Sequence, residues 1–118
     1  MKVQEAIMAF SQSEKIKAGL IWVSQSLQLL QGISESERQA EGKICKAIIG
    51  MIVHEIQLGK NVTGDESWDE VWRCLDRAMV MIDSGVPLEA VVNLTKALSQ
   101  VTSIGHRSMS FLRKQDLL

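Results

Sequence analysis

The chain has 118 residues, a common size for one domain and long enough to bury a core. Its hydrophobic content of 46% and charged content of 23% are typical of a globular protein and argue against intrinsic disorder. The net charge of −1 gives no general attraction to nucleic acid or to an anionic membrane. Two cysteines are too few for a disulfide scaffold. We therefore expect one domain over residues 1–118 in the cytoplasm, with neither nucleic acid nor a membrane as partner.

The composition predicts an all-α fold. The chain contains one proline and no tyrosine, helix-forming residues dominate, and no stretch alternates apolar and polar residues as a half-buried strand would. The first predicted element is a short N-terminal helix over residues 3–10. Ser11 then precedes Glu14 by three residues, the spacing of a capping box, and predicts a new helix that continues to about Gln31. Gly32 is expected to end it in a left-handed conformation.

The same capping signal recurs at Ser34 and Glu37 and predicts a third helix, which is expected to end near Gly59. Residues 60–64 are polar and are predicted to form a loop. Two overlapping capping boxes within residues 63–70 predict the start of a fourth helix.

The fourth helix is expected to end at residues 84–85. Pro87 suits the first turn of a last helix, which continues to about Lys114. Because the connections are short, successive helices should be antiparallel. The sequence therefore predicts an antiparallel bundle of four main helices plus a short N-terminal helix. Gly105 lies on the apolar side of the last helix and should allow a neighbouring backbone to approach closely.

The third predicted helix is apolar over more than half of its circumference, and the second carries an additional apolar stripe that includes Trp22 and Leu29. A small bundle buries one stripe per helix, so this surplus predicts self-association, with a homodimer favoured, or binding of a protein partner. The alternative is that the short N-terminal helix covers the second stripe. The residues predicted to form the interface are Trp22, Leu29, Ile49, Val53 and Ile56.

Carboxylates suggest a different function. Glu55 lies within the apolar arc of the third helix and Glu41 is on the same line, so Glu55 should be paired, protonated or facing a cavity. Glu66 and Asp69 resemble the ExxD half of the magnesium site of all-α nucleotide pyrophosphohydrolases, but the preceding helix has no ExxE.

No complete catalytic set occurs in the sequence, and no cofactor is expected. The predicted function is therefore a non-enzymatic interaction, adaptor or regulatory protein. The alternative is a small-ligand or divalent-metal-dependent enzyme, similar to a nucleotide pyrophosphohydrolase, that uses Glu41, Glu55, Glu66 and Asp69.

Overall fold

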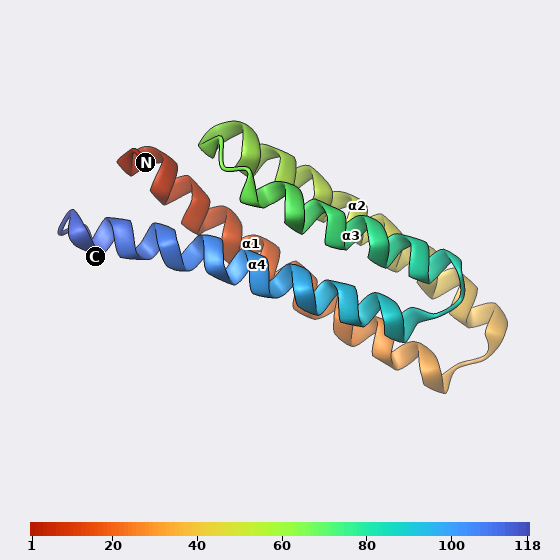
Figure 1. The fold of residues 1–118 in the computed structure, drawn as a ribbon. Helices are drawn as coiled ribbons and strands as arrows, with labels where there is room; N and C mark the ends of the chain where they lie inside the picture. Colours follow the sequence, from red (N-terminus) through yellow and green to blue (C-terminus); the bar gives the residue numbers. More distant parts are fainter.

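The computed structural model describes residues 1–118 and shows four long helices packed as a bundle, without strands (Figure 1). This confirms the predicted all-α class. A single 3₁₀ turn, η1 (Leu30–Gly32), follows the first helix. The helices are α1 (Val3–Leu29), α2 (Glu35–Thr63), α3 (Ser67–Asp83) and α4 (Pro87–Lys114).

Each helix has two main neighbours. α1 packs against α4 and α2, while α3 packs against α4 and α2, so the four helices form a square in cross-section. The Cα atoms span 53 × 22 × 17 Å, and both termini lie at the same end of this rod (Figure 1). The radius of gyration is 15.5 Å, against about 13.5 Å for a spherical domain of this length. An elongated bundle of this kind exposes much of each helix along its length.

The predicted N-terminal helix exists, but it is continuous with the next one as α1. Ser11 is exposed and caps nothing, because the buried positions of α1 pass through this point without a break. Packing of a continuous stripe therefore overrides the local capping signal. The buried residues that follow each other by three or four positions are Ala6, Ala9, Ser13, Ile16, Leu20, Val23, Leu27 and Leu30.

The predicted start of α2 is confirmed, because the Ser34 hydroxyl accepts a hydrogen bond from the Glu37 backbone N–H at 3.4 Å. Its predicted end is wrong. The helix continues to Thr63 and stops at Gly64, whose φ of 68° supplies the left-handed cap. Gly59 is small for another reason: a Cβ there would lie 3.0 Å from the buried ring of Trp68. Gly32 is also not left-handed, since the positive-φ glycines are Gly64 and Gly85.

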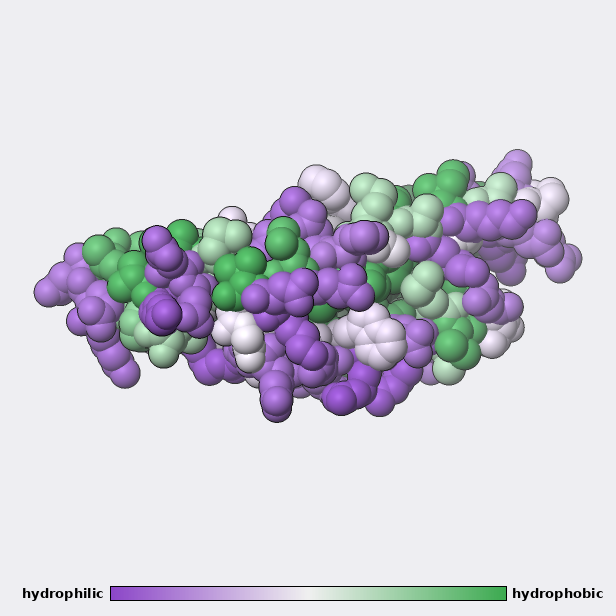
Figure 2. All heavy atoms as spheres, turned by 90° about the horizontal axis from the view of Figure 1, so that it is seen from above, coloured by the Kyte–Doolittle hydropathy of each residue, from purple (hydrophilic) through white to green (hydrophobic).

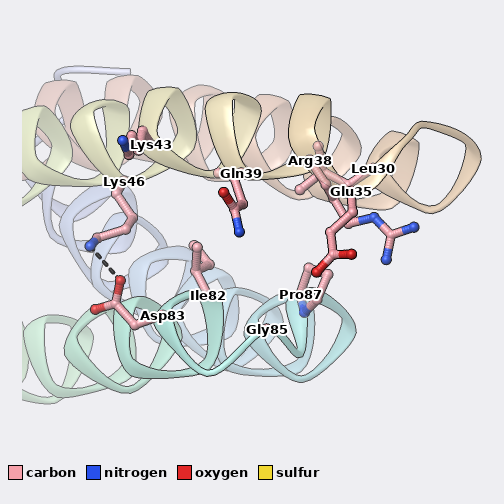
Figure 3. Close-up of a pocket in the computed structure, with 11 residues that line it drawn as sticks. Leu30, Glu35, Arg38, Gln39, Lys43, Lys46, Ile82, Asp83, Gly85 and Pro87 are labelled. Atoms are coloured by element: carbon pink, nitrogen blue, oxygen red, sulfur yellow. Dashed lines mark hydrogen bonds and ion pairs between the residues drawn. The ribbon is translucent and has the colours of Figure 1, made fainter.

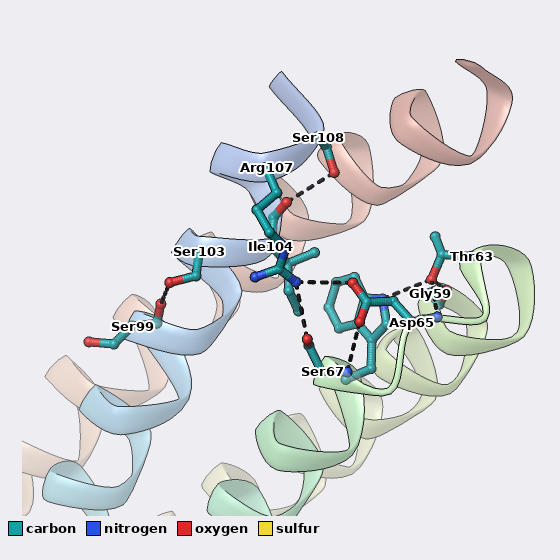
Figure 4. Close-up of polar contacts among 10 residues, drawn as sticks. Gly59, Thr63, Asp65, Ser67, Ser99, Ser103, Ile104, Arg107 and Ser108 are labelled. Atoms are coloured by element: carbon teal, nitrogen blue, oxygen red, sulfur yellow. Dashed lines mark hydrogen bonds and ion pairs between the residues drawn. The ribbon is translucent and has the colours of Figure 1, made fainter. Parts of the chain in front are cut away.

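The start of α3 is held by Asp65 and not by the predicted capping boxes (Figure 4). The Asp65 carboxylate accepts a hydrogen bond from the backbone N–H of Ser67 at 2.8 Å and pairs with Arg107 of α4 at 3.0 Å. The Thr63 hydroxyl accepts a hydrogen bond from the indole N–H of Trp68 at 3.1 Å. This cluster fastens the turn between α2 and α3 to α4.

Two further predictions about the last helix are confirmed. Pro87 lies in the first turn of α4, and the helix ends at Lys114. Gly105 marks the close crossing of α4 and α1, because a Cβ at this position would lie 2.5 Å from the Ser13 hydroxyl oxygen.

Candidate interaction face and carboxylates

α2 carries two parallel stripes of residues, one buried and one exposed. The first is buried, lies against α1 and α3, and is called here the inner stripe. Its members step by three and four, as in a coiled-coil seam. The inner stripe consists of Gly42, Cys45, Ile49, Ile52, Ile56 and Gly59.

The second stripe of α2 lies roughly 140° further round the helix. Met51 at its centre is 66% exposed, and every other member is exposed as well. We call it the outer stripe of α2. It consists of Ala40, Ile44, Ala47, Met51, Leu58 and Val62.

α1 adds a similar exposed line, the outer stripe of α1, formed by Met8, Lys15, Trp22 and Leu29 at intervals of seven residues. Trp22 is 69% exposed and Leu29 is 74% exposed. Lys15 lies on the α2 side of this helix, because its ammonium group pairs with the Glu55 carboxylate at 2.8 Å.

By helical phase, the two outer stripes lie on the same side of the α1–α2 pair. They therefore form one continuous surface, which we call the outer face. Seen from above, the molecule exposes apolar side chains at several places among the polar ones along its length (Figure 2). What distinguishes the outer face is the regular spacing of its apolar residues on two adjacent helices.

The predicted interface residues divide into two groups. Trp22 and Leu29 are exposed, as the interface prediction requires. Ile49 and Ile56 are 0% and 2% exposed and belong to the core of the bundle, so they cannot anchor a partner. Val53 is partly buried and packs against the same core. The predicted side of the third helix lies nearly half a turn from the exposed stripe, because residues two positions apart differ by about 200° around a helix. The apolar arc contains two stripes that the sequence pattern did not separate.

The exposed residues of α2 that sequence reasoning missed, such as Ile44 and Met51, did leave a signal. The apolar residues of this helix separate into two series displaced from each other by one or two positions. Both step by three and four residues, except that the exposed series has one step of seven, from Met51 to Leu58. Two overlapping series in one helix indicate two packing partners.

The carboxylates of the alternative prediction are not brought together. Glu41 is exposed, and it lies about 21 Å along α2 from Glu55, since each residue adds about 1.5 Å to a helix. Glu66 is exposed at the start of α3, and Asp69 pairs with Lys60 of α2. The structure contains no group of three or more His, Cys, Asp or Glu residues placed to hold a metal ion.

Glu55 is paired, one of the outcomes expected for it. Its carboxylate accepts hydrogen bonds from the side-chain amide of Gln12 at 2.9 Å and from Lys15 at 2.8 Å. These two contacts lower the pKa of Glu55 below its ordinary value, against a smaller opposing effect of burial. The group therefore stays ionised at neutral pH and links α1 to α2. It faces no cavity.

A shallow groove of about 450 Å³ lies where the N-terminal half of α2 faces the turn between α3 and α4 (Figure 3). Its lining combines cationic side chains with Glu35 and Asp83, and Lys46 is already paired with Asp83. Gln39 points into the groove (Figure 3). No free charged group converges on one point there, so the groove supplies neither a catalytic set nor a defined ligand site.

Comparisons with known proteins do not assign a family. The sequence matches no protein-family model, and neither a curated protein nor a solved structure shows significant similarity to it. None of the helices combines the length and the apolar character that crossing a membrane requires. The case for function therefore rests on the geometry of the outer face.

Proposed function

We propose that this chain is a non-enzymatic interaction protein of the cytoplasm, an adaptor or regulatory subunit that acts through the outer face and self-associates. The observation that carries the proposal is the outer stripe of α2. Its members step by three and four apart from one step of seven, from Met51 to Leu58, and no part of the chain covers it. A helix needs one such stripe to join its own bundle, and a second one suits a helix of another subunit.

The outer stripe of α1 supports the same proposal. Trp22 offers a large, mostly exposed aromatic surface, and Leu29 lies two turns further along the same line. Tryptophan is among the residues most enriched at the energetic centres of protein interfaces. Ordered helices on both sides of the contact also keep the entropy cost of association low, because side chains there are attached to a rigid backbone.

Two single substitutions test the proposal. Trp22→Ala removes an exposed anchor, so it should lower the assembled fraction, measured by sedimentation velocity, while leaving the helical circular dichroism unchanged. Glu55→Gln is the control, because it neutralises the central carboxylate but keeps its size; it should leave assembly nearly unaffected. A wild-type protein that sediments as a monomer at about 100 μM, a concentration at which micromolar complexes are mostly formed, would contradict self-association.

The carboxylate-based alternative gains no support from the geometry. Two of its four residues are engaged by lysines, and the other two are exposed and separate. If Glu55→Gln abolished binding of magnesium in a calorimetric titration without loss of fold, the alternative would replace the present proposal.

A further inference from the structure

We infer that the occupant of the outer face is a second copy of this chain, stacked face to face so that α1 lies on α1 and α2 lies on α2 of the partner subunit, each pair antiparallel. The two-fold axis lies in the plane of the interface, perpendicular to the helices, at the level of Met51. This inference rests on the proposed self-association and adds to it the partner and the register.

The first observation is that the outer stripe of α2 is symmetric about its centre. Ile44 and Leu58 each lie seven residues from Met51, and Ala40 and Val62 each lie eleven residues from it. An antiparallel copy centred on Met51 therefore places Ile44 opposite Leu58 of the partner subunit. It also places Ala40 opposite Val62 of the partner subunit, and the two Met51 side chains meet at the axis. These pairs join apolar residues, whereas Ala47, four residues before Met51, lies opposite Glu55 of the partner subunit.

The second observation is that the outer stripe of α1 has the same symmetry. Its four members are arranged evenly about a point midway between Ala18 and Gly19. An antiparallel copy centred there places Leu29 opposite Met8 of the partner subunit and Trp22 opposite Lys15 of the partner subunit. The second pairing brings an ammonium group to an indole ring, which is a favourable cation–π arrangement.

The third observation is that both centres lie at the same height along the rod. A Cβ at Gly19 would lie 3.1 Å from Cδ1 of Ile52, which follows Met51 directly, so the two centres are adjacent across the α1–α2 contact. The Lys15–Glu55 ion pair fixes the same alignment four residues further along α2 from Met51. One two-fold axis can therefore satisfy both helices at once, as an isologous interface requires.

The area of the outer face is also close to that of a standard protein–protein interface. Residues 40–62 cover about 33 Å of helix, and two neighbouring helices are about 20 Å wide, which gives a face of roughly 650 Å². A standard interface buries about 800 Å² per partner.

A second face-to-face arrangement has its two-fold axis parallel to the helices, which places α1 over α2 of the partner subunit. Leu29 would then lie at the level of Glu41 of the partner subunit, since both are ten or eleven residues from their respective centres. The internal symmetry of the two stripes would have no role in that arrangement. Lys15 would lie at the level of Glu55 of the partner subunit, whose charge is opposite, so charge does not separate the two arrangements. The pattern of the two stripes favours the stack of α1 on α1 and α2 on α2.

Disulfide cross-linking of variants with one introduced cysteine in the full chain tests the register. Met51→Cys should form a covalent dimer on mild oxidation, because the two introduced thiols meet at the axis within the Cα separation of about 4.4–6.8 Å that a disulfide needs. Val80→Cys is the matched control: Val80 is 51% exposed but lies on α3. The native Cys45 and Cys74 are buried and should not react.

Two further samples test whether the helices pair in the proposed register. Ile44→Cys alone should remain uncross-linked, because its copies would lie about 21 Å apart, whereas an equimolar mixture of Ile44→Cys and Leu58→Cys should cross-link. A different result would be a dimer in which Met51→Cys alone does not cross-link but a mixture of Ala18→Cys and Met51→Cys does. The stack of α1 on α1 and α2 on α2 would then be wrong, while the proposed function would stand. If no variant and no wild-type sample assembles at all, both are wrong.

Discussion

The inner and outer stripes of α2 have opposite environments. The inner stripe steps by three and four throughout, whereas the outer stripe has one step of seven, from Met51 to Leu58. Ile49 of the inner stripe is completely buried by the other helices of the chain, while Met51, two positions along, is mostly exposed. The inner stripe has three isoleucines and a cysteine between two glycines, and the outer stripe has two alanines, an isoleucine, a methionine, a leucine and a valine. The comparison teaches that spacing identifies a packing surface but does not say whether the neighbour belongs to the same chain.

The largest difference between the stripes should appear in folding stability. Ile49→Ala removes a buried side chain and should lower the free energy of unfolding by about 2–5 kcal/mol. Met51→Ala should change it by less than about 0.5 kcal/mol when the chain is monomeric, because an exposed side chain leaves no cavity. Urea denaturation at low protein concentration measures both values. Equal losses would mean that Met51 is packed within its own chain.

The next effect concerns assembly. Met51→Lys should raise the dimer Kd by at least about 30-fold, which corresponds to about 2 kcal/mol, because the substitution occurs twice at the axis and places two like charges together. Val80→Lys, an equally drastic change at an exposed site on α3, should leave the Kd unchanged. Sedimentation equilibrium gives both constants. A similar loss in the two variants would indicate a general charge effect instead of a specific face.

Replacing a packed glycine and an open glycine by alanine should change folding stability in opposite directions. Gly105→Ala should destabilise the bundle by about 1–3 kcal/mol, because the added methyl collides with Ser13 where α4 crosses α1. Gly50→Ala adds a methyl where no atom lies within 4 Å, so better helix propensity should stabilise α2 by up to about 1 kcal/mol. Thermal unfolding followed by circular dichroism should show melting temperatures that move in opposite directions.

A smaller effect should depend on pH. Burial alone would raise the pKa of Asp65, but hydrogen bonds with Ser67 and Arg107 outweigh it and lower the pKa below the ordinary value of 3.8. The stabilisation by this carboxylate is therefore complete above that ordinary value and is lost as the pH falls through the lower value of the folded state. Asp65→Ala should cost about 1 kcal/mol at neutral pH, as for a lost helix cap. Denaturation curves should show this difference shrinking below about pH 4; a constant difference would contradict the assignment.

The smallest expected effect is that of Glu55→Gln on stability. Its partner Lys15 is largely exposed, and Gln12 keeps a second hydrogen bond, at 2.9 Å, to the backbone oxygen of residue 55. The variant should therefore lose less than about 1 kcal/mol, as is usual for surface ion pairs. A loss of several kcal/mol in urea denaturation would show that this link between α1 and α2 is essential to the fold.

Local signals in the sequence predicted much of the fold. Ser34 and Pro87 mark helix starts because their effect depends only on neighbouring backbone, and Gly105 was recognised from its place on an apolar side. Ser11 misled because burial of the flanking stripe keeps α1 continuous. Gly59 misled because its small size serves the packing of Trp68, a contact between residues that only the folded chain brings together.

The candidate site was predictable only in part for the same reason. Trp22 and Leu29 were identified because they form a second stripe on a helix whose core stripe is narrow. On α2, apolar residues cover more than half of the circumference, so the pattern alone could not say whether Ile49 or Met51 faces inward. That choice depends on how far α2 is rotated about its axis when it packs against α1 and α3.

The most direct test of the central claim, that the outer face joins two copies of this chain, is native mass spectrometry of the wild-type protein. The account predicts a species of twice the 13.1 kDa chain mass, with no added ligand mass, that is replaced by the monomer in Met51→Lys. A wild-type protein that stays monomeric across the accessible concentrations, or a dimer that survives Met51→Lys unchanged, would contradict it.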